Sequence, residues 1–222
     1  MIYDILLNIL SLEMFFVPIG VDCDVANFLN KYNLRKMSLP FDWNVSYNGV
    51  SKCIDCNFEH FTEPLNESRI NAQDVYFHHD FLDKNTFIAE KEKYNRRCSR
   101  LLTILKECET KGEEVYFIRK GHLRMHHSEH NGKYEDIKSD IDDAECLNRV
   151  LCDKYPQLKF KIILILGCGA CFNKEIIYKG DSDNIDIHNC FCNSDKYDDR
   201  IKLFENCLLD ALSANIKDCL RL

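Results

Sequence analysis

The sequence predicts an α/β fold, a single domain in which a central mixed sheet is flanked by helices. Short apolar segments of strand length alternate along the chain with longer segments that carry an apolar stripe at helical spacing. No internal repeat and no linker rich in Pro or Gly interrupts this alternation, and 222 residues are enough for one sizeable core. We therefore predict one domain over residues 1–222.

Strong local signals mark the elements of the first half of the chain. "EMFFVPIG" is a short apolar run that ends in Gly20, and Asp22 can cap the helix that follows it. A later run places Val75, Phe77 and His79 on one face, as in a strand. The predicted elements are a strand at 13–20, a helix at 22–33, a turn at 38–46, an irregular polar stretch at 47–73, a strand at 73–81 and a helix at 86–111.

The second half continues the alternation. "FKIILILG" is continuously apolar, which is typical of a strand buried on both faces. The predicted elements are a strand at 113–120, a histidine-rich loop at 121–137, a helix at 140–154, strands at 160–167 and 174–180, a loop at 181–195 and a helix at 198–220.

Composition excludes several classes of protein. The net charge is −7 and the basic residues are scattered among acidic ones, which argues against nucleic acid as the partner. No apolar run reaches the roughly 20 residues of a spanning helix, and the apolar N-terminus lacks a basic start, so we expect a cytoplasmic protein without a membrane partner. The thirteen cysteines are odd in number, and reduced thiols are expected. "GCGACF" lacks the third glycine of a dinucleotide-binding fingerprint and the Lys-Ser/Thr pair of a phosphate-binding loop. No cofactor is therefore predicted.

Cys23 is the candidate nucleophile. The strand that ends in Gly20 turns at once into a helix, which places Cys23 at the helix N-terminus. Unpaired backbone N–H groups there favour an anion, so we expect a lowered pKa and a reactive thiolate. The same N–H groups can hold an oxyanion, as acyl transfer requires. The alternative is that Cys23 is one more structural thiol.

A nucleophilic cysteine needs a base and a group that orients it. His78 and His79 precede Asp80 in a predicted strand, where alternation sends the two rings to opposite faces. Asp42, in "PFDW", follows the first helix and could orient an imidazole. These residues could instead be structural. The histidines would then simply end a strand, and Asp42 would form a hydrogen bond within a turn.

Five motifs occur in order: "PIGVDCDVANFL", "RKMSLPFDW", "FHHDF", "KYNRRCSRL" and "VYFIRK". Together they resemble a poorly characterised family of papain-like cysteine peptidases found in bacteria and in large DNA viruses. The resemblance covers residues 14–120 and leaves 121–222 unassigned. It departs from the family where Pro18 and Ile19 stand in place of Ser-Leu before Gly20.

The resemblance implies a papain-like fold and a cysteine hydrolase that acts on a protein or peptide, in the host cytoplasm for a viral member. It makes Cys23 the nucleophile and His79 the base, with His78 an extra. Asp80 or Asp42 would be the orienting acid. Arg119 would be a structural or substrate-side charge.

Two other functions stay open at this point. One is an inactive interaction module of the same fold. The other is a zinc-stabilised domain, because zinc takes four N or S ligands and close Cys pairs can supply them. The candidate ligands are Cys53, Cys56 and His60; Cys168, Cys171, Cys190 and Cys192; and the cluster His122, His126, His127 and His130.

Overall fold

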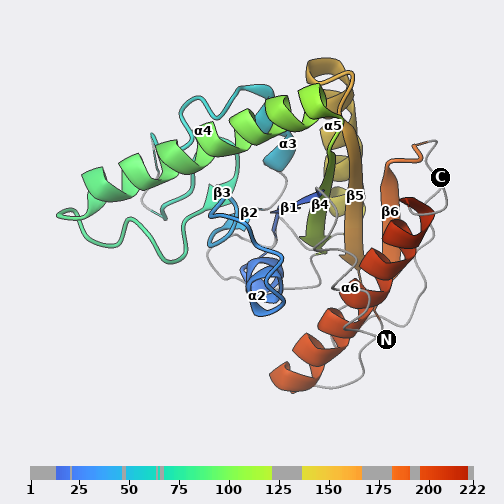
Figure 1. The fold of residues 1–222 in the computed structure, drawn as a ribbon. Helices are drawn as coiled ribbons and strands as arrows, with labels where there is room; N and C mark the ends of the chain where they lie inside the picture. The colour runs from blue at the N-terminus through green and yellow to red at the C-terminus, as the bar shows by residue number, and fades with distance from the viewer. Residues whose placement is uncertain are drawn as a thin grey trace.

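The structure is a computed structural model, and it describes residues 14–20, 22–46, 49–63, 65, 68–121, 137–166, 182–190 and 196–219. Its elements, shown in Figure 1, are β1 (Met14–Pro18), α2 (Asp24–Lys31), β2 (Val45–Ser46), α3 (Val50–Asp55), β3 (Val75–Tyr76), α4 (Phe87–Lys111), β4 (Glu114–Lys120), α5 (Ile137–Lys154), β5 (Lys159–Leu166), β6 (Ile185–Asn189) and α6 (Tyr197–Cys219).

The described strands form one parallel sheet and one short antiparallel pair. The parallel sheet has the order β1-β4-β5-β6, with Val17 opposite Phe117 and Phe117 opposite Ile162. β2 and β3 pair separately and antiparallel. The predicted α/β fold with helices flanking the sheet is confirmed, and the parallel and antiparallel pairings lie in two different sheets.

Helices cover both faces of the parallel sheet, because its strands are apolar on both sides. Val115 and Phe117 of β4 belong to the cluster that includes α3, α4 and α5, whereas Tyr116 and Ile118 belong to the cluster that includes α2 and α6. Side chains alternate between the two faces of a strand, so β4 serves both clusters. The result is three layers, helix, sheet and helix (Figure 1).

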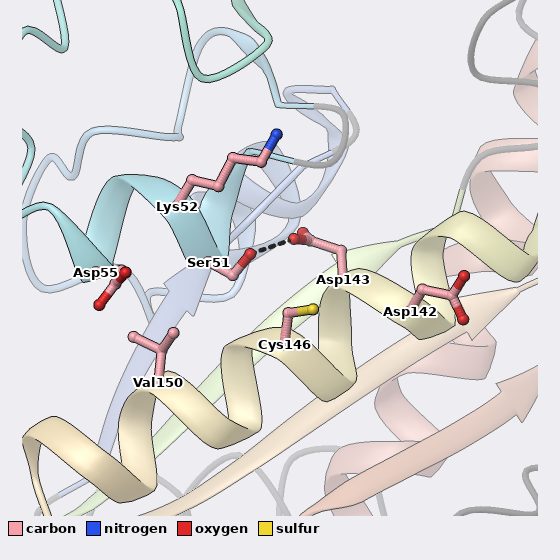
Figure 2. Close-up of a pocket in the computed structure, with 7 residues that line it drawn as sticks. All are labelled: Ser51, Lys52, Asp55, Asp142, Asp143, Cys146 and Val150. Carbon is pink, nitrogen blue, oxygen red and sulfur yellow. Dashed lines mark hydrogen bonds between the residues drawn. The ribbon is translucent and has the colours of Figure 1, made fainter.

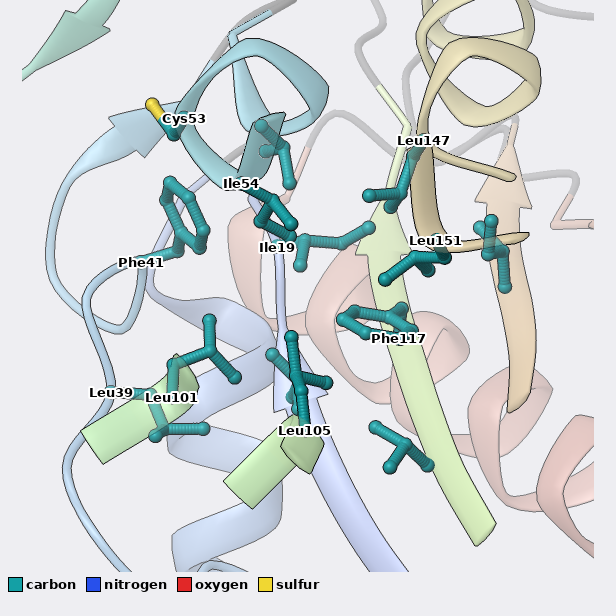
Figure 3. Close-up of a cluster of buried hydrophobic side chains, with 14 of the residues drawn as sticks. Ile19, Leu39, Phe41, Cys53, Ile54, Leu101, Leu105, Phe117, Leu147 and Leu151 are labelled. Atoms are coloured by element: carbon teal, nitrogen blue, oxygen red, sulfur yellow. The ribbon is translucent and has the colours of Figure 1, made fainter. Parts of the chain in front are cut away.

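The larger cluster joins three helices to the sheet, as Figure 3 shows. Phe117 is fully buried and faces Leu147 and Leu151 of α5. Each large apolar side chain buried in this way contributes about 1.5–3 kcal/mol. The cluster fixes the position of α4, whose C-terminal half packs against the sheet through Leu101 and Leu105.

Several elements differ from the sequence-based expectation. The stretch predicted as irregular contains α3, and the loop predicted at 181–195 contains β6. Both are short, and tertiary contacts stabilise them: α3 packs against α5, and β6 pairs with β5. The strand predicted at 73–81 is only two residues long. The strand predicted at 174–180 lies outside the described residues.

The long helices and the other strands match their predictions to within three residues, and α4 ends as expected at Gly112, whose φ of 72° closes the helix. Within the described residues no helix has the length and apolar composition that crossing a membrane requires. That all of 1–222 forms one domain stays a prediction.

Candidate functional site

The turn after β1 is fixed by backbone bonds to β4. Ile19 N donates to Ile118 O at 2.9 Å, and Lys120 N donates to Gly20 O at 3.1 Å. Gly20 has a φ of 107°, and a Cβ placed there would lie 2.3 Å from Ser46 Oγ. Only glycine fits this conformation and this close approach. The chain can therefore leave the sheet sharply and enter α2.

Arg119 ties this turn to two neighbouring elements. Its Nε donates to Asp140 Oδ1 at 2.6 Å, and its Nη1 donates to Ile19 O at 2.9 Å and to Ser46 O at 2.8 Å. The Arg119 side chain is 2% exposed and that of Asp140 1%. Of the two roles predicted for Arg119, the structure therefore supports the structural one. A substrate-binding role would need an exposed guanidinium.

Cys23 is the N-cap residue of α2 and is half-buried. Its carbonyl accepts the first helical bond, from Asn27 N at 2.9 Å. Asp22, predicted as the cap, lies one residue before it: the cap position is held by Cys23, and Asp22 Oδ1 accepts a bond from Asp24 N at 2.9 Å. Cys23 thus lies at the helix N-terminus, at the carboxyl end of a parallel strand, which is where α/β sheets bind ligands.

Lys120 and Tyr197 complete the surroundings of Cys23. Lys120 Nζ lies 3.0 Å from Asp22 Oδ2 and also bonds to Asp24 Oδ2. The Tyr197 hydroxyl donates to Asp24 Oδ1 at 3.2 Å. Lys120 ends β4 and Tyr197 begins α6, so the site joins three elements that are far apart in the sequence.

The expected lowering of the Cys23 pKa is wrong. Burial raises the pKa of the Cys23 thiol, and Asp22 and Asp24 raise it further, whereas Lys120 acts in the opposite direction. Burial, which disfavours any charge, and the two neighbouring carboxylates, beside which a thiolate would be a third negative charge, together outweigh the helix N-terminus. The thiol is the favoured form in the resting protein.

The two predicted histidines follow β3 and are both exposed. Their rings are T-shaped to each other with centroids 4.6 Å apart. Because β3 ends at Tyr76, the strand alternation predicted for them does not apply: Phe77 is buried and His79 is not. Arg69 holds this segment by donating to the carbonyls of Phe77 and His78 at 2.9 and 3.0 Å.

The Asp80 carboxylate is bound by α4. Lys93 Nζ donates to Oδ1 at 2.5 Å, and the Tyr94 hydroxyl donates to Oδ2 at 2.7 Å. Tyr94 is fully buried, and the aromatic rings of Phe77 and Phe81 pack against it. In this arrangement Asp80 anchors the His-Asp-Phe segment to α4.

Asp42 is likewise bound within its own segment. It is fully buried, its Oδ2 accepts bonds from Arg35 and, at 2.9 Å, from Leu39 N, and burial raises its pKa although Arg35 opposes the shift. Arg100 of α4 donates to Ser38 O at 2.6 Å. Polar bonds therefore join "RKMSLPFDW" and "FHHDF" to "KYNRRCSRL" of α4, which gives these motifs a structural role.

The structure thus brings Lys120 and Tyr197, which the sequence-based reasoning missed, to the carboxylates of Asp22 and Asp24 that flank Cys23. Among the described hydrogen bonds and ion pairs, none joins Cys23 to His79. α2 packs in the cluster on one face of the sheet, and the aromatic residues around Asp80 pack in the cluster on the other. The sequence showed only that Lys120 ends a strand; its place near Cys23 follows from the parallel pairing of β4 with β1.

The Cys53-x-x-Cys56 pair does not form a metal site. Cys53 is fully buried in the core (Figure 3), and burial raises its pKa well above the usual value. His60 is exposed. Over the part of the chain that the structure describes, no group of three metal-ligating side chains is arranged to hold an ion. The other predicted ligands, apart from the buried Cys190, lie outside that part.

A pocket of about 410 Å³ lies between α3 and α5 (Figure 2). Ser51 Oγ donates to Asp143 Oδ1 at 2.6 Å, the bond drawn in the figure. Lys52, Asp55, Asp142, Cys146 and Val150 complete the lining that the structure describes. This lining holds a thiol and carboxylates without a histidine, and includes none of the residues predicted to take part in catalysis.

Comparison with known proteins gives the class first. Residues 14–75 match the model of a family described as "Putative papain-like cysteine peptidase (DUF1796)". The match includes Cys23 and Asp42 and ends just before the two histidines, so it is shorter than the predicted resemblance over 14–120. The predicted resemblance to this family is confirmed.

One relative is a viral protein. The chain is 31% identical over 144 residues to "Uncharacterized protein R408" of Acanthamoeba polyphaga mimivirus, a large DNA virus. The match covers 50% of this chain and 63% of the relative, which is less than two thirds of the relative's length. No solved structure matches the chain.

Proposed function

We propose that the protein is a cysteine hydrolase that cleaves an acyl bond in a protein or peptide, with Cys23 as its nucleophile. The observation that carries the proposal is the position of Cys23. It caps α2 at the carboxyl end of β1, half-exposed, inside the segment that matches the peptidase family. N–H groups of a helix N-terminus beside the sulfur can hold the oxyanion that acyl transfer creates.

The reaction would follow the two steps of nucleophilic catalysis. Cys23 Sγ, once deprotonated, attacks the carbonyl carbon, and the leaving amine or alcohol takes up the proton as the thioester forms. Water then attacks the thioester and releases the acid and the thiol. The resemblance implies His79 as the base, and that role requires its ring within about 2.6–3.2 Å of the sulfur, directly or through a water. No described hydrogen bond joins the two residues, so His79 would have to approach Cys23 when substrate binds.

The test compares thiols and histidines within the one chain. An electrophilic peptide-like probe should label Cys23 faster than the exposed Cys152, as judged by mass spectrometry of the labelled peptides. Cys23→Ala should abolish hydrolysis of a peptide library and Cys152→Ala should not. His79→Ala should slow the labelling of Cys23 more than His78→Ala does. Equal labelling of both thiols, with no hydrolysis, would contradict the proposal.

A specific observation also favours an inactive binding module of the same fold. The pKa of Cys23 is raised, and both candidate acids, Asp80 and Asp42, are held in ion pairs with α4 or Arg35. A module of this kind would retain its partner after Cys23→Ala. A hydrolase would lose turnover with the same change while its fold, monitored by circular dichroism, stays intact.

For either function we place the protein in the cytoplasm, which for a viral protein is that of the host. The described cysteines are free thiols, as a reducing compartment keeps them.

A further inference from the structure

Lys120 is held between two carboxylates that flank Cys23 in the sequence. Its side chain is 14% exposed, and its Nζ bonds to Asp22 and Asp24 at once. Phe204 of α6 lies beneath it, with the ring centroid 5.6 Å from Nζ. From the same helix, Tyr197 donates to the other oxygen of Asp24. The ammonium is therefore fixed in place rather than free to swing into solvent.

These contacts define the charges that act on the sulfur. Asp22 and Asp24, one on each side of Cys23, oppose a thiolate, and Lys120 favours it. Although burial alone would lower it, the two carboxylates raise the pKa of Lys120, so the ammonium stays charged across the range in which thiols ionise. Burial and the neighbouring Asp24 raise the pKa of the Tyr197 hydroxyl, so Tyr197 stays neutral in the same range.

We propose that Lys120 is the positioning residue that controls how readily Cys23 ionises, because it neutralises both carboxylates that flank the thiol. Lys120 acts through Asp22 and Asp24 and through its own charge. Its catalytic meaning rests on the proposed hydrolase function, whereas its effect on the ionisation of Cys23 does not.

The proposal fixes the direction of the pH shift for two substitutions. Without Lys120 the uncompensated carboxylates repel a thiolate, so Lys120→Met should move Cys23 ionisation to higher pH. Removal of one carboxylate by Asp22→Asn should move it to lower pH, while the Asn oxygen can still accept the bond from Asp24 N. Neighbouring charges of this kind shift a pKa by about 1–3 units. We therefore expect at least a roughly tenfold slower alkylation for Lys120→Met near neutral pH, since the thiolate is the reactive form.

The experiment measures the rate at which iodoacetamide alkylates Cys23 as a function of pH, followed by mass spectrometry of the peptide that contains it. In this reaction the thiolate displaces iodide and a thioether forms. The variants are Lys120→Met, Lys120→Arg, Asp22→Asn and the double variant that combines Lys120→Met with Asp22→Asn. Lys31→Met is the matched control, because Lys31 lies on α2, the helix that Cys23 caps, and pairs with Glu205 of α6.

The expected result is a pH profile shifted upward for Lys120→Met, shifted downward for Asp22→Asn, and close to that of the natural protein for Lys120→Arg, the double variant and the control. An unshifted profile for Lys120→Met, or shifts of the same sign for the two single variants, would overturn the proposal. If Lys120→Met does not fold, as circular dichroism would reveal, Asp22→Asn carries the test alone, and an unchanged or upward shift refutes it. Absence of peptide hydrolysis, with these shifts present, would refute the hydrolase proposal only.

Discussion

Replacement of Arg119 by methionine removes the charge that joins β4, the turn after β1, β2 and α5, while it keeps most of the apolar length of the side chain. The variant removes the ion pair between Arg119 and Asp140, whose side chain is 1% exposed. It also removes the donor that reaches Ile19 O and Ser46 O at 2.9 and 2.8 Å.

The expected loss of stability follows from these contacts. Breaking a buried ion pair by removal of one partner costs about 3–5 kcal/mol, because the remaining charge is left uncompensated. A domain is typically stable by about 5–15 kcal/mol, so Arg119→Met should remove a large part of the total. With an m-value of about 2 kcal/mol per molar, the urea midpoint should fall by about 2 M.

Urea unfolding followed by circular dichroism measures this loss. Lys31→Met is the control, since its partner Glu205 lies 2.6 Å away but the Lys31 side chain is 56% exposed, and such pairs contribute about 0–1 kcal/mol. The double variant with Asp140→Leu should recover part of the loss, because it removes the uncompensated carboxylate. A loss below about 1 kcal/mol for Arg119→Met would refute the reasoning.

Three further predictions concern stability. Gly20→Ala should lower the free energy of unfolding by more than about 2 kcal/mol, because of its φ of 107° and the Cβ contact, and by clearly more than Gly112→Ala, where a Cβ meets nothing within 4 Å; thermal unfolding compares the two. Tyr94→Phe should cost about 1.5–3 kcal/mol in urea unfolding, because the loss of a 2.7 Å bond leaves a buried carboxylate with one donor fewer; an unchanged midpoint would contradict the anchoring role. His188 bonds to Asp186 at 2.7 Å, and this bond raises the pKa of His188. Burial opposes ionisation of Asp186, but the bonds from His188 and Asn215 together outweigh it, and the pKa of Asp186 is lowered. The pair therefore stabilises the fold fully between about pH 4 and 6.5, and this stabilisation is lost as pH rises through the raised pKa of His188. His188→Gln should therefore be more destabilising at pH 5.5 than at pH 8.5, by less than about 1 kcal/mol. An equal loss of stability at both pH values would refute this reasoning.

The strongest sequence signals determined the main elements of the fold. β5 is a continuous apolar run, and α4 is a helix of 25 residues with an apolar stripe and a glycine at its end, so local chemistry alone predicts both. The position of Cys23 between a strand and a helix was equally local. Short elements such as α3 and β6 carry too few residues for a periodic signal, and their partners stabilise them.

Only the tertiary structure decided the surroundings of Cys23. The parallel pairing of β1 with β4 brings Lys120 to the thiol across 97 residues of sequence, and α6 adds Tyr197 from still farther along the chain. The sequence placed a helix N-terminus at Cys23 and so predicted a lowered pKa. The packed structure adds two neighbouring carboxylates and partial burial, and the pKa rises, because the ionisation of a thiol depends on the total field and on its access to water.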